Sequence, residues 1–111
     1  MRFGVNNAIW KQILDTCFHF PDVKHVILYG SRARGDQQPG SDIDIAIDAP
    51  DMSSQTFARL WNALDDLPII FSMDIVHLQA IKNQVLVQAI QNEGVILHCI
   101  KLSDADTRTS C

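Results

Sequence analysis

The sequence has few cysteines, and those it has are not grouped. Cys17, Cys99 and Cys111 are an odd number and lie far apart. No Cys-x-x-Cys pair and no cluster of cysteine and histidine has the spacing of a zinc site. This pattern predicts neither a disulfide framework nor a zinc-binding fold. We expect isolated buried thiols in a reducing, cytoplasmic compartment.

Long apolar runs and a surplus of basic residues are also lacking. No stretch approaches the ~20 apolar residues that cross a membrane, and the first residues do not resemble a secretory signal. The 9 basic and 13 acidic residues give a formal net charge of −4. Affinity for nucleic acid comes mostly from lysine and arginine. We therefore expect no membrane association and no direct binding of DNA.

What the sequence does have is enough apolar residues for one small core. Of its 111 residues, 47% are hydrophobic and 20% are charged, which is ordinary for a globular domain. No internal repeat or linker divides the chain. We expect one domain over residues 1–102. Residues 103–111 are polar without periodicity, and we expect them to be a flexible C-terminal tail.

Hydrophobic periodicity predicts an alternation of helices and strands. Helical spacing and capping residues predict one helix from Asn6 or Asn7 to about Phe20, and another between Ser53 or Ser54 and Pro68. A third helix is expected over residues 79–92, with Gly94 as its left-handed cap. Apolar or alternating runs predict strands over residues 26–29, 42–48, 69–78 and 95–97. This order predicts an α+β fold, a small mixed sheet with helices packed on it.

Three aspartates occupy unusual positions in these predicted strands. Asp42 and Asp44 lie two residues apart on one strand, so that their side chains point to the same face. Asp74 interrupts another strand that is otherwise apolar, where a carboxylate is costly unless it is paired or bound to a metal. If the two strands are neighbours, all three acids converge. Ligands that are all oxygen favour Mg²⁺ or Mn²⁺ over zinc.

Residues 30–41 form a loop rich in glycine, serine, proline and charge. Gly30 and Ser31 follow a predicted strand directly, and a helical turn starting there would present free N–H groups to an anion. Arg32 and Arg34 would add positive charge. A phosphate cradle beside a metal held by carboxylates is suited to phosphoryl or nucleotidyl transfer. Each part alone is more often a turn or a solvated strand face, and only the combination is specific.

The stretch YGSRARGDQQPGSDIDIAI, residues 29–47, resembles the signature of the DNA polymerase beta-like nucleotidyltransferases, and the chain looks like their minimal bacterial and archaeal members. The resemblance implies the fold of that family, with ATP as substrate and two Mg²⁺ ions, or Mn²⁺, as cofactor. It implies that the nucleotide is bound by Gly30, Ser31, Arg32, Arg34 and Ser41. It also implies that Asp42, Asp44 and Asp74 bind the metals and act in catalysis.

The resemblance also implies a partner, because minimal members work with a small helical protein of the HEPN group. In such toxin–antitoxin pairs the nucleotidyltransferase is the antitoxin and transfers AMP to the partner. Two alternatives stay open. One keeps the chemistry but uses a small molecule such as an aminoglycoside, or an RNA end, as acceptor. The other is an antitoxin that binds nucleotide and occludes its partner without catalysis. A homodimer also stays open.

Overall fold

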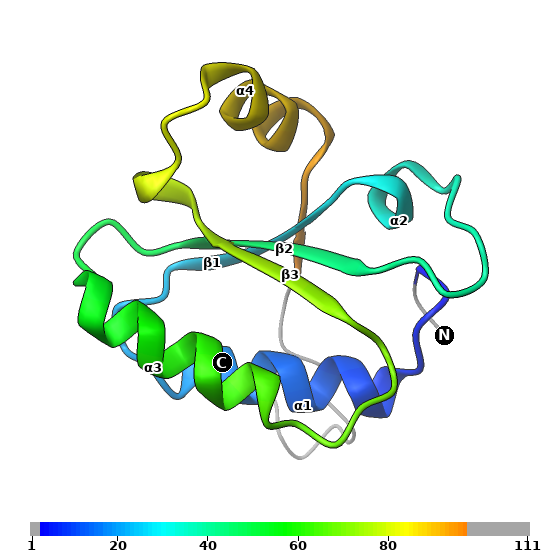
Figure 1. Cartoon of the computed structure of the whole chain (residues 1–111), viewed down its shortest axis with the longest axis horizontal. Coiled ribbons are helices and arrows are strands. Elements are labelled where there is room, and N and C mark those ends of the chain that lie inside the picture. Colours follow the sequence, from blue (N-terminus) through cyan, green and yellow to red (C-terminus); the bar gives the residue numbers. More distant parts are fainter. Residues whose placement is uncertain (1–2, 98–111) are drawn as a thin grey trace, which may run out of the picture.

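The computed structural model describes residues 3–97, which form a single sheet with helices on both of its faces (Figure 1). In chain order the elements are α1 (Asn7–Phe18), β1 (His25–Tyr29), α2 (Ser31–Arg34), β2 (Ile43–Asp48), α3 (Ser54–Asp65), β3 (Met73–His77), the short 3₁₀ helix η1 (Leu78–Ala80), α4 (Gln84–Glu93) and β4 (Val95–Leu97). This order of helices and strands confirms the α+β fold that the periodicity predicts.

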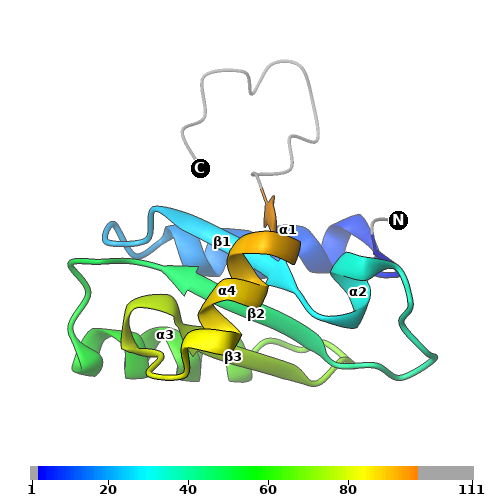
Figure 2. The ribbon, with the colours of Figure 1, turned by 90° about the horizontal axis from the view of Figure 1, so that it is seen from above.

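The sheet is mixed, with strand order β3-β2-β1-β4. β1 is antiparallel to both β2 and β4, whereas β2 and β3 are parallel. Parallel neighbours need a crossover connection, which α3 supplies between β2 and β3. α1 and α3 lie side by side under the sheet in Figure 1, and α4 lies above it. Seen from above, α4 runs across the strands rather than along them (Figure 2).

The core lies between the sheet and the pair α1 and α3. The predicted alternation of β2 is confirmed, because Ile43, Ile45 and Ile47 are all fully buried on that side. The other core residues of β1, α1 and α3 are Val26, Leu28, Trp10, Ile13, Leu14, Cys17, Leu60 and Leu64. Cys17 is fully buried, as predicted, and burial raises the pKa of its thiol to about 12.

Two side chains fix the starts of the supporting helices. The Asn6 side chain accepts a hydrogen bond from the Ala8 N–H at 2.6 Å, and the Ser53 hydroxyl accepts one from the Thr56 N–H at 3.1 Å. Of the candidates that the sequence leaves open, Asn6 and Ser53 are therefore the caps. Each satisfies a backbone N–H that the first helical turn leaves without a partner.

The third strand is shorter than the sequence predicts. An apolar run extends over residues 69–78, but β3 begins only at Met73. Its neighbour β2 begins at Ile43, whose register partner is Met73, so residues before Met73 have no strand beside them. Ile69 and Phe71 instead pack against the core as loop residues. A run of β-formers becomes a strand only where a partner supplies hydrogen bonds.

The last helix starts later than predicted. Residues 78–80 form η1, and residues 81–83 belong to no helix or strand, so that α4 begins only at Gln84. The Asn83 side chain accepts hydrogen bonds from Val85 N–H at 3.0 Å and Leu86 N–H at 3.4 Å, which starts a new helix there. The buried face of α4 is small, because Val85 is 77% exposed and Ile90 is the one fully buried residue of this helix.

Gly94 ends α4, but not in the left-handed conformation that we expect from the sequence. Its backbone is extended, with φ −66° and ψ 145°. Glycine is needed there for space, since a Cβ would lie 2.5 Å from Ile27 Cγ2 and would collide with the Ile90 carbonyl oxygen. The close approach of α4 to β1, rather than a positive φ, explains this residue.

Several predictions from the sequence concern parts of the chain outside these elements. Residues 103–111, predicted as a tail, and Cys99 and Cys111, predicted as buried thiols, lie outside the described residues. Within residues 3–97, no helix combines the length and the apolar character needed to span a membrane.

Candidate active site

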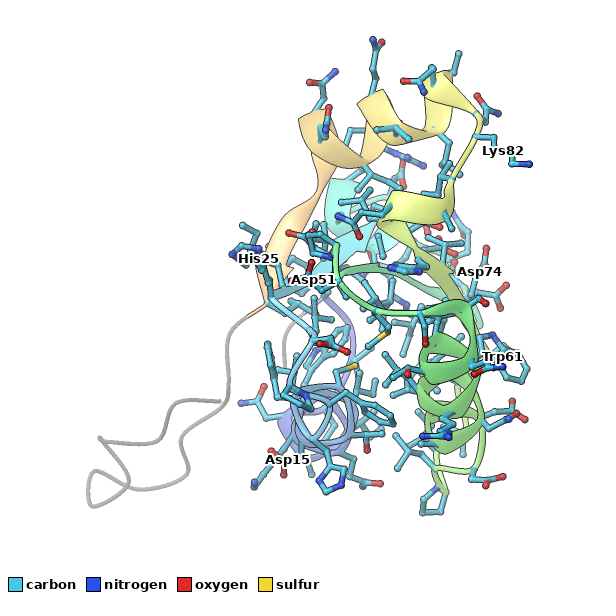
Figure 3. The ribbon with its side chains drawn as sticks, turned by 90° about the vertical axis from the view of Figure 1, so that its left-hand side faces the viewer. Asp15, His25, Asp51, Trp61, Asp74 and Lys82 are labelled. Carbon is cyan, nitrogen blue, oxygen red and sulfur yellow. The ribbon has the colours of Figure 1, made fainter. Side chains whose placement is uncertain are left out.

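The sheet face opposite the core carries a row of polar side chains across three strands. Tyr29 of β1 pairs with Asp44 of β2, and Asp44 pairs in turn with Asp74 of β3. Residues that face each other in register point to the same side of a sheet. Ile43 and Ile45 enter the core, so this row faces away from it. Figure 3 shows Asp74 at the level of the sheet, between α4 above and α3 below.

Asp42 precedes β2 and is exposed, two residues before Asp44. The two predicted acidic strands are neighbours, as convergence of the acids requires, and they place Asp44 and Asp74 on adjacent parallel strands. Among residues 3–97, however, no three carboxylate, imidazole or thiol groups are placed closely enough to surround one ion. Binding of a cation requires these side chains to turn toward each other. Their roles as metal ligands stay a prediction.

The electrostatics of this row favour a cation. Burial raises the pKa of Asp44, and repulsion by Asp74 and Asp42 raises it further, against the opposing effect of Arg34 and Arg32. The pKa of the Tyr29 hydroxyl is raised to about 12, by burial first and then by Asp74 and Asp44. A group of carboxylates that raises the pKa of its neighbours has a negative potential, and oxygen ligands of this kind suit Mg²⁺.

Gly30, which precedes Ser31, lies directly beside Asp44. Gly30 has φ 78° and ψ −155° and turns the chain from β1 into α2, as the predicted helical turn requires. α2 is a single turn, in which the Gly35 N–H donates to the Ser31 carbonyl at 2.9 Å. A Cβ at Gly30 would collide with the Asp44 carboxylate, so the turn and the acid are in contact. Phosphate binding at this turn is a prediction that the geometry leaves open.

Arg32 does not extend into solvent. Its side chain is buried, with 3% exposed. Nη1 donates to the Phe3 carbonyl and Nη2 donates to the Ser41 carbonyl, each at 2.8 Å. The guanidinium also lies over the ring of Phe71, 4.9 Å from its centroid. These contacts are with the protein itself, and they were not predicted from the sequence.

Arg34, in contrast, is exposed and paired. Its Nη1 donates to the Glu93 carboxylate of α4 at 3.1 Å, and its Nε donates to Asp36 at 3.2 Å. These hydrogen bonds, to Glu93 first and Asp36 second, raise the pKa of the guanidinium. The predicted nucleotide ligand is thus held by two acids, one of which joins α2 to α4.

Ser41 closes the loop between α2 and β2. Its hydroxyl accepts a hydrogen bond from the Gln38 N–H at 2.9 Å, and its own N–H donates to the Gln38 carbonyl at 3.0 Å. The Ser41 carbonyl accepts from Arg32. Ser41 therefore fixes the chain immediately before Asp42, and a direct contact with nucleotide stays a prediction.

Two residues of the site are not predicted from the sequence. Tyr29 stands in the same row as Asp44 and Asp74, and Glu93 binds Arg34 from the far end of α4. For Tyr29 a signal exists, because it ends the strand just before Gly30. For Glu93 none exists, since 59 positions separate it from Arg34.

Comparisons with known proteins add structural relatives of this chain. It is 27% identical to a chain in a crystal structure of a toxin–antitoxin with AMP-PNP, over 87% of this chain and 76% of that one, with a TM-score of 0.60. Two chains from crystal structures of mutants of the toxin–antitoxin MntA-HpeT are similar as well. They are 26% and 30% identical over 87% of this chain and 75% of theirs, with TM-scores of 0.56 and 0.55. No protein of curated function gives a significant match.

The sequence itself also matches a defined family. The match is to the family described as polymerase beta, nucleotidyltransferase, and it covers residues 11–102. This span includes Gly30, Ser31 and the three aspartates of the candidate site. The chain therefore belongs to the polymerase beta nucleotidyltransferase family.

Proposed function

We propose that this chain is a Mg²⁺-dependent nucleotidyltransferase that moves AMP from ATP to a hydroxyl group on a helical HEPN-family partner, as the antitoxin of a toxin–antitoxin pair. One observation carries the proposal. Asp44 and Asp74 lie in register on adjacent parallel strands, on a face that also holds the Gly30–Ser31 turn. Similar chains occur in crystal structures of toxin–antitoxin complexes, one of them with AMP-PNP, an analogue of ATP.

The residues divide the reaction between them. The backbone at Gly30 and Ser31 binds the phosphates, and Asp42, Asp44 and Asp74 are the carboxylates that would hold the metal ions. Bound Mg²⁺ supplies neutralisation of phosphate charge and activation of the attacking oxygen. The acceptor oxygen forms a bond to the α-phosphorus while the bond to the bridging oxygen breaks, and pyrophosphate leaves. Asp74 takes the proton of the acceptor hydroxyl.

The acceptor has to approach from the open side of Asp74. Among residues 3–97, β3 is an edge strand, so no described strand lies along its outer side. A cavity of about 410 Å³ lies on the α3 side of this edge, formed by α3 and the segment before β3, and its lining includes Met73 and Ile75 rather than Asp74. Ile70, with 92% exposed, and Trp61, with 39% exposed, border this cavity. Exposed apolar side chains that lie together, as these two do along one cavity, are typical of a protein contact.

This edge supports a partner protein as acceptor over a small molecule. A small acceptor would need a closed pocket that orients its hydroxyl, and orientation accounts for up to ~7–11 kcal/mol in favourable intramolecular reactions. A partner docked at the β3 edge would provide that orientation itself. We place its contact at Ile70 and Trp61 and around the mouth formed by residues 30–44.

The test is to incubate the chain with ATP and Mg²⁺, with and without the protein encoded by the neighbouring gene, and to weigh both proteins by mass spectrometry. We expect a mass increase of one or more AMP units on the partner. Asp42→Asn and Asp44→Asn should each abolish it. Asp51→Asn, which changes an exposed acid outside the site, is the matched control and should leave it intact.

Other outcomes would select the alternatives. A partner that binds tightly and is never modified would favour the occluding antitoxin. Efficient modification of an aminoglycoside or an RNA end by the chain alone would favour the small-molecule or RNA acceptor. The mass of the isolated chain in solution, measured by light scattering, decides whether a homodimer forms.

A further inference from the structure

Arg32 is the buried charged residue of the described part of the chain. Its guanidinium contacts three segments that are distant in sequence. The Phe3 carbonyl belongs to the segment before α1, the Ser41 carbonyl ends the loop before β2, and the Phe71 ring belongs to the segment before β3. Figure 1 shows the first of these segments running beside α2 and its loop toward α1.

Arg32 and two of its three contacts lie close in sequence to residues of the candidate site. Arg32 itself follows Ser31, and Ser41 precedes Asp42. Phe71 lies three positions before Asp74. The segment of Phe71 is tied to β2 as well, because the Ile43 N–H donates to the Ser72 carbonyl at 2.9 Å. One side chain therefore fixes the turn and the starts of both acidic strands against each other.

The same contacts leave little of Arg32 for a nucleotide. Both terminal nitrogens donate to backbone carbonyls, and Nε is buried without a hydrogen-bond partner. With 3% of the residue exposed, a phosphate would reach the guanidinium only if these contacts opened. A Cβ at Gly4 would lie 2.8 Å from Nη1, so the backbone closes over it from the N-terminal side.

We propose that Arg32 is a positioning residue for nucleotidyl transfer and does not bind the phosphates. It holds Ser31 and the strand starts of Asp42, Asp44 and Asp74 in one arrangement. Beside it lies a cavity of about 300 Å³, whose lining includes Gln38, Pro39 and Gly40 of the loop. Without the guanidinium the loop has room to move into this space, and the acids move with it.

The shape of the side chain matters here as much as its charge. The planar guanidinium donates to two carbonyls at once and stacks on the ring of Phe71. A lysine ammonium at this site is a point charge on a flexible stem and does not reproduce that fork. Arg32→Lys should therefore behave like Arg32→Met. Phe71→Leu keeps the charge and removes the ring, and it alters a residue outside the predicted site.

The experiment compares these three variants with Arg59→Met, which removes an exposed arginine of α3 as a matched control. The inference rests on the proposed function for its kinetic readout. Transfer is measured well below the melting temperature of each variant. We expect kcat to fall about 10-fold in Phe71→Leu and about 100-fold in Arg32→Lys, as misplacement of about 1 Å allows. The KM for ATP should stay within about twofold of the wild-type value in each.

A second readout does not depend on transfer. Hydrogen exchange of the amides of residues 35–42 should speed up in Phe71→Leu and Arg32→Lys and stay unchanged in Arg59→Met. Binding of a non-hydrolysable ATP analogue should stay close to that of the wild type. If the wild-type chain transfers nothing, the proposed function fails while these two measurements still test Arg32.

Two results would overturn the inference. One is a large loss of affinity for the analogue in both Arg32 variants with normal behaviour of Phe71→Leu, which would make Arg32 a phosphate ligand. The other is a lower melting temperature with unchanged kcat and exchange, which would make it a residue of stability alone. If Arg32→Met does not fold, Phe71→Leu decides the question.

Discussion

Gly30 and Asp44 are in such close contact that a Cβ on residue 30 would collide with the Asp44 carboxylate. The two residues lie 14 positions apart, at the end of β1 and near the start of β2, and the antiparallel register of these strands brings them together. Glycine is thus required at position 30 for two reasons: its φ of 78° is unfavourable for other residues, and the acid beside it leaves no space for a Cβ.

Gly30→Ala should displace the Asp44 side chain and abolish transfer. The strained φ alone costs about 1 kcal/mol or more, and the collision adds to it. Gly35→Ala is the matched control, because Gly35 also has a positive φ, 87°, but has no atom near the position of a Cβ. We expect both variants to lose stability in chemical denaturation and only Gly30→Ala to lose transfer. Equal activities in the two variants would contradict this contact.

Asp44→Asn should abolish transfer and stabilise the chain without nucleotide and metal. The pKa of Asp44 is raised by burial and by Asp74 and Asp42, so its ionised form is less favourable in the folded state than in the unfolded state. This penalty is present at neutral pH and disappears as the pH falls below the pKa values of both states. We expect a melting temperature about 2–4 °C above that of the wild type at pH 7.

Thermal melts at a series of pH values check this sign. The difference between Asp44→Asn and the wild type should shrink as the pH is lowered toward 4, about the ordinary pKa of an aspartate. Asp51→Asn, at an exposed position, should show no such trend. A melting temperature of Asp44→Asn below that of the wild type at pH 7 would contradict the predicted repulsion.

The charge of Asp48 should stabilise the folded chain, whereas that of Asp44 destabilises it. Partial burial works to raise its pKa, but hydrogen bonds from His25 and Gln79 lower it overall. Asp48 accepts from Gln79 Nε2 at 2.6 Å and lies 2.8 Å from His25 Nδ1. A lowered pKa contributes stability that is present above the unfolded pKa and is lost as the pH falls through the folded one.

Asp48→Asn should therefore lower the free energy of unfolding by about 1 kcal/mol at pH 6–7. The loss should vanish at acid pH, where the wild-type carboxylate is protonated as well. Urea denaturation of both proteins at several pH values measures this difference. A constant difference at every pH would show that packing rather than charge is responsible. Asp51→Asn, at an exposed position outside any helix or strand, serves as the control.

Glu93→Gln should strengthen the binding of ATP. Glu93 holds Arg34, the exposed arginine predicted to contact the nucleotide, at 3.1 Å. Removing this competing charge leaves Arg34 free for phosphate and also reduces repulsion of the nucleotide. We expect the Kd of a non-hydrolysable ATP analogue, measured by calorimetry, to fall about 2–5-fold, with less effect at high salt.

The control for this variant removes the same charge elsewhere. Asp15→Asn breaks the exposed pair of Lys11 and Asp15 on α1, which are 2.7 Å apart, and changes the net charge equally. It should leave the Kd unchanged. If both variants bind the analogue equally tightly, net charge rather than release of Arg34 explains the effect. If neither does, Arg34 has no part in binding.

The sequence by itself determined the elements whose signals are local. Asn6 and Ser53 cap their helices through contacts two or three residues away, and the alternation of Ile43, Ile45 and Ile47 fixes which face of β2 enters the core. The lone acid in the third strand, and the two acids just before and within the second, were visible for the same reason. Periods of two and of 3.6 residues are properties of the chain alone.

The tertiary structure decided what depends on partners distant in sequence. The pairing of Asp44 with Asp74 follows from the parallel register, and the length of β3 follows from where β2 begins. The sequence predicts that Arg32 adds charge to a phosphate cradle, and only the fold shows that two carbonyls and a ring from other segments bury it. Burial and pairing are set by the packing of whole elements, because a side chain gains a buried environment only where other segments supply hydrogen bonds and contacts.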